Sequence, residues 1–220
     1  QVIDNTTGDN SRVPGIVEID SEQKTINKWT FIGAPFTSNN RNYKFGSVAP
    51  VSGSDIAMVK WIHNNGEWNT DWAAVRDEIS AGEGAFAWPF YNGVVTFSTH
   101  DFGYNTGYPN PFTNVSADYR LNKGTVEVEK TLPTGANRWM ALVNPYPAKL
   151  KIASFLGDNT NIQGGVTYRF NGTSFEIQNA TNGEILMTEG FFVNLSSGNK
   201  VTFTQDQLSY NQPATEAKSS

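Results

Sequence analysis

The chain repeats its own pattern about halfway along, and few folds can accommodate such a repeat. The segment Trp29–Phe36 (WTFIGAPF) resembles Trp139–Tyr146 (WMALVNPY), which lies 110 positions later. Upstream, Glu18 matches Glu127 at an offset of 109. Downstream the offset is 106, and the matches include Asn65-Gly66 with Asn171-Gly172, Glu83-Gly84 with Glu189-Gly190, Phe86 with Phe192, and Val95–Phe97 with Val201–Phe203. Because Gly and Pro mark restricted backbone positions and aromatics mark core positions, these matches predict two copies of one unit.

The repeat also sets the expected domain boundaries. We expect repeat one at 14–99 and repeat two at 123–206. Between them, residues 100–122 interleave aromatic residues with Gly and Pro, which predicts a loop that is packed down on the protein. Residues 1–13 and 207–220 are polar and are expected to form terminal tails. The sequence leaves open whether the repeats form one domain or two.

Short segments with the pattern of β-strands run through both copies. In the second copy, residues 166–170 alternate apolar and polar side chains, Asn171-Gly172 follows, and residues 175–178 alternate again. Because Asn-Gly accepts the positive φ angles of a tight turn, this pattern predicts a β-hairpin. The first copy repeats it from Val59 through Gly66 to Trp68.

A final hairpin is also expected in each copy. It would join 85–90 to 94–99 through Asn92-Gly93, and 191–195 to 200–204 through Ser197-Gly198-Asn199. With the strands expected at 16–19, 29–32, 125–128 and 139–143, each copy has about five or six short strands. We therefore predict an all-β fold of two tandem β-sandwich or jelly-roll-like units, with short helices at most, at 72–79 and 150–156.

Composition excludes several classes of function. Only 17% of the residues are charged, and the net charge is −5 with 16 Lys and Arg spread along the chain, so we expect no nucleic-acid partner. No apolar run is long enough to cross a membrane as a helix, so we expect no membrane insertion. With no cysteine and two histidines, the chain has little material for metal sites or catalytic triads, and we expect neither metal nor cofactor.

The acidic residues do not form a convincing catalytic pattern. A glycosidase needs two carboxylates held about 5 to 10 Å apart, and Glu83 and Glu189 are the matched pair, but they occupy equivalent places in separate copies. A tight strand entry at each Glu-Gly is the favoured interpretation. The run Asp158–Asn161 could offer oxygens to Ca²⁺, yet it lacks the Gly and Glu of an EF-hand loop, which favours a polar turn.

A group of aromatic residues in the first copy is the favoured place for ligand binding. Flat exposed aromatics with polar neighbours hold sugar rings by apolar contact and directional hydrogen bonds. Residues 1–110 also carry all of the net negative charge, with 12 acids and 7 bases against 9 and 9 in the remainder. Burial in the core is the alternative for these aromatics. The candidate ligand-binding residues are Trp61, His63, Asp71, Trp72 and Trp88.

The motifs of the second copy resemble a known family. A Trp-led strand ending in Asn-Pro-Tyr-Pro, a Val-x-Tyr-x-Phe-Asn-Gly hairpin, a Glu-Gly-Phe-Phe-Val strand and a Val-Thr-Phe strand lie within 138–204. This pattern resembles the duplicated β-rich domains of secreted, surface-associated Bacteroidetes proteins that often precede a type IX secretion sorting domain. The first copy has Gly33-Ala34-Pro35-Phe36 in place of the Asn-Pro-Tyr-Pro signature.

The resemblance implies an extracellular or cell-surface bacterial protein. Gln1 matches the residue that follows the signal-peptide cut in that phylum, and no sorting domain follows Asn211, so we expect a fragment or a protein exported by another route. Such domains occur in adhesins and in enzymes, so the family alone does not fix the role.

Three functions are carried forward from the sequence. The first is a non-catalytic extracellular binding or adhesion module, whose partner is a surface glycan or an extracellular protein. The second is a structural spacer or subunit of a surface appendage, assembled through exposed strand edges. The third and least favoured is a polysaccharide hydrolase. The sequence does not predict the oligomeric state.

Overall fold

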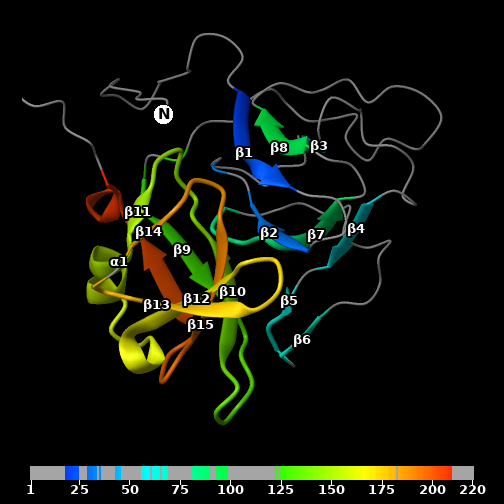
Figure 1. Cartoon of the computed structure of the whole chain (residues 1–220). Helices are drawn as coiled ribbons and strands as arrows, with labels where there is room; N and C mark the ends of the chain where they lie inside the picture. The colour runs from blue at the N-terminus through cyan, green and yellow to red at the C-terminus, as the bar shows by residue number, and fades with distance from the viewer. Residues whose placement is uncertain are drawn as a thin grey trace, which may run out of the picture.

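The computed structural model describes residues 18–24, 29–33, 35, 43–45, 56–59, 61–64, 66–68, 81–89, 93–98, 122, 124–181 and 183–209. Across these residues the chain is mostly strands with one short α-helix, in agreement with the predicted all-β class (Figure 1). The possible helix at 72–79, the connector except Asn122, and most of both predicted tails lie outside the described residues.

The second half contains the α-helix and eight strands. The helix, α1, covers Ile152–Asp158 and falls at the helical segment predicted from the sequence. Two short 3₁₀ turns, η2 (Gln163–Gly165) and η3 (Gln205–Gln207), punctuate the strands. The strands are β9 (Val126–Glu129), β10 (Trp139–Val143), β11 (Leu150–Lys151), β12 (Val166–Phe170), β13 (Phe175–Asn179), β14 (Glu184–Ile185), β15 (Gly190–Asn194) and β16 (Lys200–Phe203).

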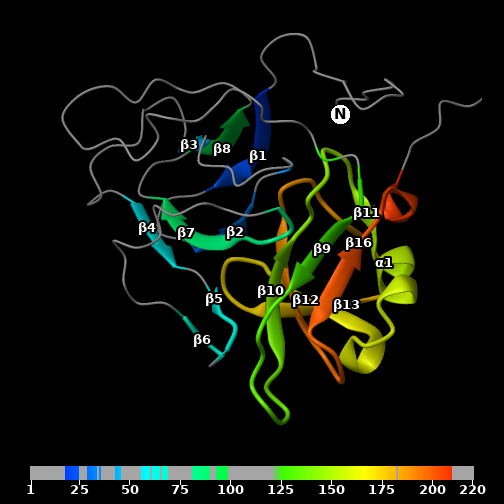
Figure 2. The ribbon, with the colours of Figure 1, turned by 180° about the vertical axis from the view of Figure 1, so that it is seen from behind.

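The described part of the first half consists of strands and the turns beside them. In chain order the strands are β1 (Glu18–Lys24), β2 (Thr30–Ile32), β3 (Tyr43–Phe45), β4 (Ile56–Val59), β5 (Trp61–Ile62), β6 (Glu67–Trp68), β7 (Ala85–Pro89) and β8 (Gly93–Ser98). Figure 2 shows β5 and β6 on the same side of the molecule as β4 and β7.

Antiparallel pairing joins the strands of each half into several small sheets. In the second half a four-stranded sheet has the order β10-β15-β12-β13, β16 pairs with β9, and β11 pairs with β14, all antiparallel. In the first half the order β2-β7-β4 forms one sheet, β1-β8-β3 another, and β5 pairs with β6. The predicted hairpins β12–β13 and β5–β6 are confirmed by these pairings.

The predicted final hairpins are wrong. The strands β7 and β8 form close to where they were expected, but β7 pairs with β2 and β4 while β8 pairs with β1 and β3. In the same way β15 pairs with β10 and β12, and β16 pairs with β9. The segment between β15 and β16 therefore carries the chain from one sheet to another, as the corners of sandwiches do.

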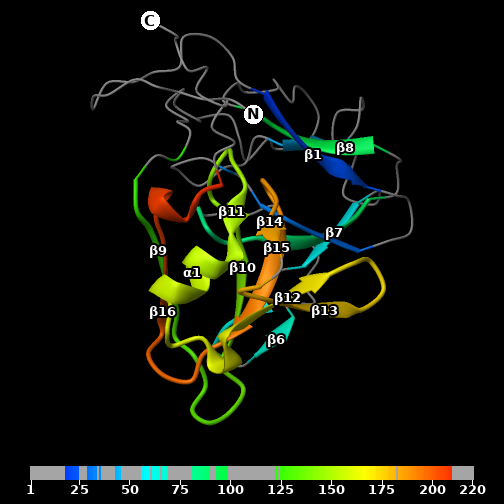
Figure 3. The same cartoon turned by 60° about the vertical axis from the view of Figure 1, so that its left-hand side comes forward.

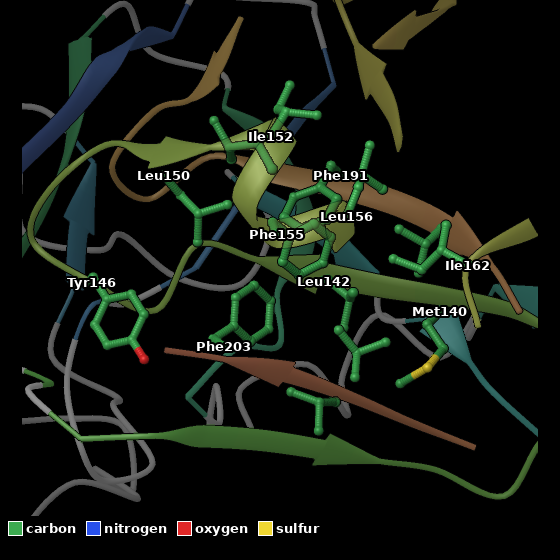
Figure 4. Close-up of a cluster of buried hydrophobic side chains, with 14 of the residues drawn as sticks. Met140, Leu142, Tyr146, Leu150, Ile152, Phe155, Leu156, Ile162, Phe191 and Phe203 are labelled. Carbon is green, nitrogen blue, oxygen red and sulfur yellow. The ribbon is translucent and has the colours of Figure 1, made fainter. Parts of the chain in front are cut away.

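The sheet β10-β15-β12-β13 is buried on both faces along β10 and β15. Met140 and Leu142 of β10, with Phe191 of β15, point into a core that β9, β16 and α1 complete (Figure 4). Val193 of β15 belongs to the same core. The intervening Ala141 and Phe192 point to the opposite face. Because side chains alternate along a strand, a strand buried on both faces reads as a continuous apolar run, which residues 139–143 form.

The opposite face of this sheet packs against the first half. A cluster formed by Phe31, Phe86, Ala141 and Phe192 lies there, and the ring centroids of Phe31 and Phe192 are 5.3 Å apart in a stacked arrangement. Figure 3 shows α1, β9 and β16 on one side of β10 and β15, and β7 on the other. We call this cluster the junction cluster.

Ordered structure continues past the repeat boundary expected at 206. Gln207 and Leu208 are buried, and the Ser209 backbone N–H donates to the Lys149 carbonyl at 2.8 Å. Leu208 also forms a bridge with Leu150. These residues, which lie within the stretch expected to be tail, seal one end of the second core.

Candidate functional site

Trp61 and His63 lie against the outer edge of β10. The Trp61 indole Nε1–H donates to the Trp139 carbonyl at 3.0 Å, and the Ala141 backbone N–H donates to His63 Nε2 at 3.4 Å. The Val143 N–H donates to the Gly82 carbonyl at 2.9 Å. Alternate residues of an antiparallel strand direct their backbone groups to opposite edges, so these contacts cover the edge that β15 does not pair.

The electrostatics of His63 fit this role in the junction. Burial, with the nearby positive charge of Lys130, lowers the pKa of His63 to about 4, and a backbone hydrogen bond at Trp61 opposes the shift. Because Nε2 accepts from Ala141, the neutral ring carries its proton on Nδ1. Protonation at Nε2 would set two N–H groups against each other and disrupt the contact.

Of the other predicted ligand-binding residues, only Trp88 lies among the described residues. Trp88 lies on β7, where it pairs with Ala57 of β4. Asp71 and Trp72 lie outside the described residues. The ring of Trp61 packs edge-on against Phe192, with centroids 5.5 Å apart. Trp61 and His63 thus join the halves, and ligand binding by this set stays a prediction.

The matched glutamates are engaged in ion pairs. Glu83 contacts Lys130 at 2.6 Å across the two halves. Glu189 binds Arg169 through both carboxylate oxygens, at 2.6 and 2.9 Å, and also accepts from the Leu186 N–H at 2.7 Å. Bidentate pairing of this kind fixes the direction of a carboxylate. These contacts favour the structural interpretation of the two Glu-Gly sites.

The polar run after α1 forms a turn tied to neighbouring strands. The Asn159 side chain donates to the carbonyls of Phe155 and Thr202 and accepts from the Thr202 N–H. Asp158 accepts from the side chain of Gln207 at 2.8 Å. Among the described residues no group of three or more His, Cys, Asp or Glu side chains could hold a metal ion. None of the described helices has the length and apolar character needed to span a bilayer.

Strand β13 presents an apolar strip that sequence reasoning missed. Phe175 and Ile177 lie on one face of β13 and remain 50% and 60% exposed. They extend the face that carries the junction cluster, since Phe175 packs edge-on against Phe192 with centroids 5.6 Å apart. Within the described chain β13 is the last strand of its sheet. The alternation of Phe175 and Ile177 signals a buried face, and only the position of the first half reveals that this part stays uncovered.

Comparison of the chain with models of protein families, with curated proteins and with solved structures found no match.

Proposed function

We propose that the chain is a non-catalytic, duplicated β module of an extracellular or cell-surface protein, and that it works by association with a second copy through β13. The observation that carries this proposal is the exposed pair Phe175 and Ile177 on β13, the last strand of its sheet among the described residues. Terminal strands offer unpaired backbone N–H and C=O groups and are natural sites of strand addition. Soluble proteins usually blunt such edges with charge, and the single charged residue of β13, Glu176, lies on the face opposite Phe175 and Ile177.

The register of strand pairing supports the duplication. Phe31 pairs with Phe86 between β2 and β7, and Ala141 pairs with Phe192 between β10 and β15. These are the partners that offsets of 110 and 106, taken from the sequence, would relate. The offset around β2 and the offset around β7 come from different parts of the sequence, yet together they relate one pair of facing residues to the other. Unrelated segments would not be expected to agree in this way.

Pairing also adjusts the alignment in two places. Ile19 pairs with Phe97 while Val126 pairs with Phe203, so the offset at β1 is 107 where the sequence match at Glu18 gives 109. Beyond the bulge between Asp20 and Gln23, Gln23 pairs with Val94 and Glu129 pairs with Lys200, so the offset there is 106.

On the other flank, Val59 pairs with Phe86 and Tyr168 with Phe192, so Tyr168 corresponds to Val59. This pairing gives an offset of 109 at β4, where the sequence match at Asn65-Gly66 gives 106.

Self-pairing of β13 meets no like-charge clash. In an antiparallel arrangement centred on Ile177, Glu176 lies opposite Gln178 of the second copy, and Phe175 lies opposite Asn179. Like charges directly opposite each other would destabilise such a pair, whereas apolar residues at the centre stabilise it. The joined sheets would extend the four-stranded sheet across both chains.

The contacts of the acidic residues support a non-catalytic role. Glu83 and Glu189 are each held by a basic side chain, and Asp158 by Gln207. A general acid or nucleophile must reach substrate, and carboxylates committed to structural partners are poorly placed to do so.

Light scattering over a concentration series tests the proposal. The intact chain should rise toward twice the monomer mass, and Ile177→Lys should weaken this association at least tenfold because it sets a charge at the centre of the pair. Ala153→Lys, on the exposed side of α1, is the matched control and should associate like the parent. A strictly monomeric parent, or association that Ile177→Lys does not weaken, would overturn the proposal.

A glycan array separates the sugar-binding alternative. Binding that is lost in Trp72→Ala or Trp88→Ala, in a chain that remains monomeric, would transfer the function to the aromatic residues of the first copy. Absence of binding to any glycan would remove that alternative.

A further inference from the structure

We infer that the two halves face each other across a pseudo-two-fold axis, so the face that joins them is a self-complementary surface whose natural partner is another copy of the same unit. In a two-fold interface, if position i contacts position j, then the equivalent of j contacts the equivalent of i. The proposed duplication supplies the equivalences, with offsets of 110 around β2 and 106 around β7.

Two backbone hydrogen bonds across the junction obey this rule. The Gly33 N–H donates to the Thr188 carbonyl at 3.3 Å, and the Val143 N–H donates to the Gly82 carbonyl at 2.9 Å. Val143 is the equivalent of Gly33, and Thr188 is the equivalent of Gly82. Each bond is therefore the image of the other under exchange of the halves.

The two acceptor residues share an unusual backbone conformation. Gly82 has φ 79°, and Thr188 has φ 63°, the only positive φ at a non-glycine residue in the described chain. A threonine seldom adopts this left-handed conformation, because its branched side chain crowds the backbone. Its presence at the position equivalent to a left-handed glycine shows that the junction imposes one turn geometry on both halves.

Equivalent residues also meet each other, as they must near a two-fold axis. A Cβ built on Gly33 would lie 2.4 Å from Val143 Cγ1, so this equivalent pair is in direct contact. Phe86 and Phe192 form a second equivalent pair, with ring centroids 6.3 Å apart. These two contacts mark where the axis passes through the junction.

The junction cluster is built from equivalent positions. Its four buried members, Phe31, Phe86, Ala141 and Phe192, are two equivalent pairs. The halves depart from symmetry at Phe31 and Ala141, because only the first half has an aromatic ring at this pair of equivalent positions. The Phe31 ring fills the space above Gly190, where a Cβ would lie 2.1 Å from the ring. The axis predicts a matching site above the buried Gly84, next to Ala141.

Moving the ring across the axis tests the inference in the full chain. Phe31→Ala should lower the melting temperature by on the order of 10 °C, because it leaves a cavity in the junction cluster. Ala141→Phe returns the ring at the equivalent position, so the Phe31→Ala, Ala141→Phe double variant should regain at least half of that loss. Phe31→Ala combined with Ala153→Phe is the control and should regain none, because Ala153 is exposed on α1.

A second exchange at the axis keeps the test decisive if the first pair folds poorly. Gly33→Val should destabilise the chain by crowding Val143, and adding Val143→Gly should restore most of the melting temperature. Recovery in either double variant beyond the Phe31→Ala, Ala153→Phe control supports the axis. If neither double variant melts above its less stable single parent, the axis is overturned. None of these changes touches β13, so failure of self-association in light scattering is a separate result.

Discussion

Under the proposed duplication Gly82 and Thr188 occupy equivalent places, and they adopt similar backbone conformations in different surroundings. A Cβ on Gly82 would lie 2.6 Å from Val128 Cγ2, so the turn of the first half presses onto β9 with no room for a side chain. Thr188 carries a full side chain and is nonetheless buried. The junction therefore fixes the shape of both turns, while the space beside each turn selects its residue.

The largest expected effect comes from adding a side chain to the tighter turn. Gly82→Ala should reduce the free energy of unfolding by about 3 kcal/mol, the sum of a left-handed alanine and the overlap with Val128. Urea denaturation measures this loss. Gly124→Ala, which meets nothing within 4 Å, is the matched control and should change stability little. A loss below about 1 kcal/mol for Gly82→Ala would contradict the tight packing described.

Acid should weaken the junction through a residue of the first half. The pKa of His63 is about 4 in the folded chain and near 6.5 when unfolded, so the unfolded state binds the extra proton first as pH falls. Stability from the neutral ring is complete above pH 6.5 and is lost toward pH 4, by about 3 kcal/mol at most.

The His63→Gln variant isolates this contribution. It replaces the acceptor with a neutral amide oxygen, so the stability difference between parent and variant should shrink or reverse from pH 7 to pH 4. Denaturation curves at several pH values measure it. Parallel pH profiles for the two proteins would show that His63 does not titrate in this range.

The matched glutamates should respond unequally to the same change. Glu189→Gln removes a bidentate partner of Arg169 and should lose about 2 kcal/mol, since hydrogen bonds to charged groups are worth more than neutral ones. Glu83→Gln removes a single partly exposed contact with Lys130 and should lose roughly 0.5 kcal/mol. Thermal unfolding at low and high salt compares them, and equal losses would refute the distinction.

The smallest effect is expected at the looser turn. Thr188→Gly relieves the left-handed strain of threonine but removes a buried side chain, so the two contributions should nearly cancel, to within about 1 kcal/mol. Its unfolding curve should lie close to that of the parent. A loss as large as that of Gly82→Ala would mean that the side chain of Thr188, and not its backbone, holds the turn.

Local structure was readable from the sequence because it depends on neighbouring residues. Residues 139–143 form β10 as predicted, and the Asn171-Gly172 turn joins β12 to β13 with Gly172 at φ 95°. The partner strands of β15 and of β16 could not be predicted from the sequence. Gly198 has the positive φ expected of a tight turn, but such a turn suits a hairpin and a sandwich corner equally, and contacts distant in sequence decide between them.

The candidate site was harder to predict for the same reason. Trp61 and His63 were singled out as aromatic and polar residues suited to a ligand, and their partners are backbone groups 78 positions away. No local pattern specifies that contact. Phe175 and Ile177 carry the alternation of a core strand, so only the extent of the opposing half reveals their exposure.

The contacts that the first half makes with the edge of β10 bear on how the protein aggregates. The five residues of β10, Trp-Met-Ala-Leu-Val, include no charge and no proline, which is the composition of segments that stack into cross-β aggregates. Trp61, His63 and the turn at Gly82 keep that edge occupied. If the two halves separate, the edge of β10 becomes exposed before the second core unfolds. The rates of aggregation on storage and on heating should therefore depend on how long the junction stays closed, and not on the global stability of the chain.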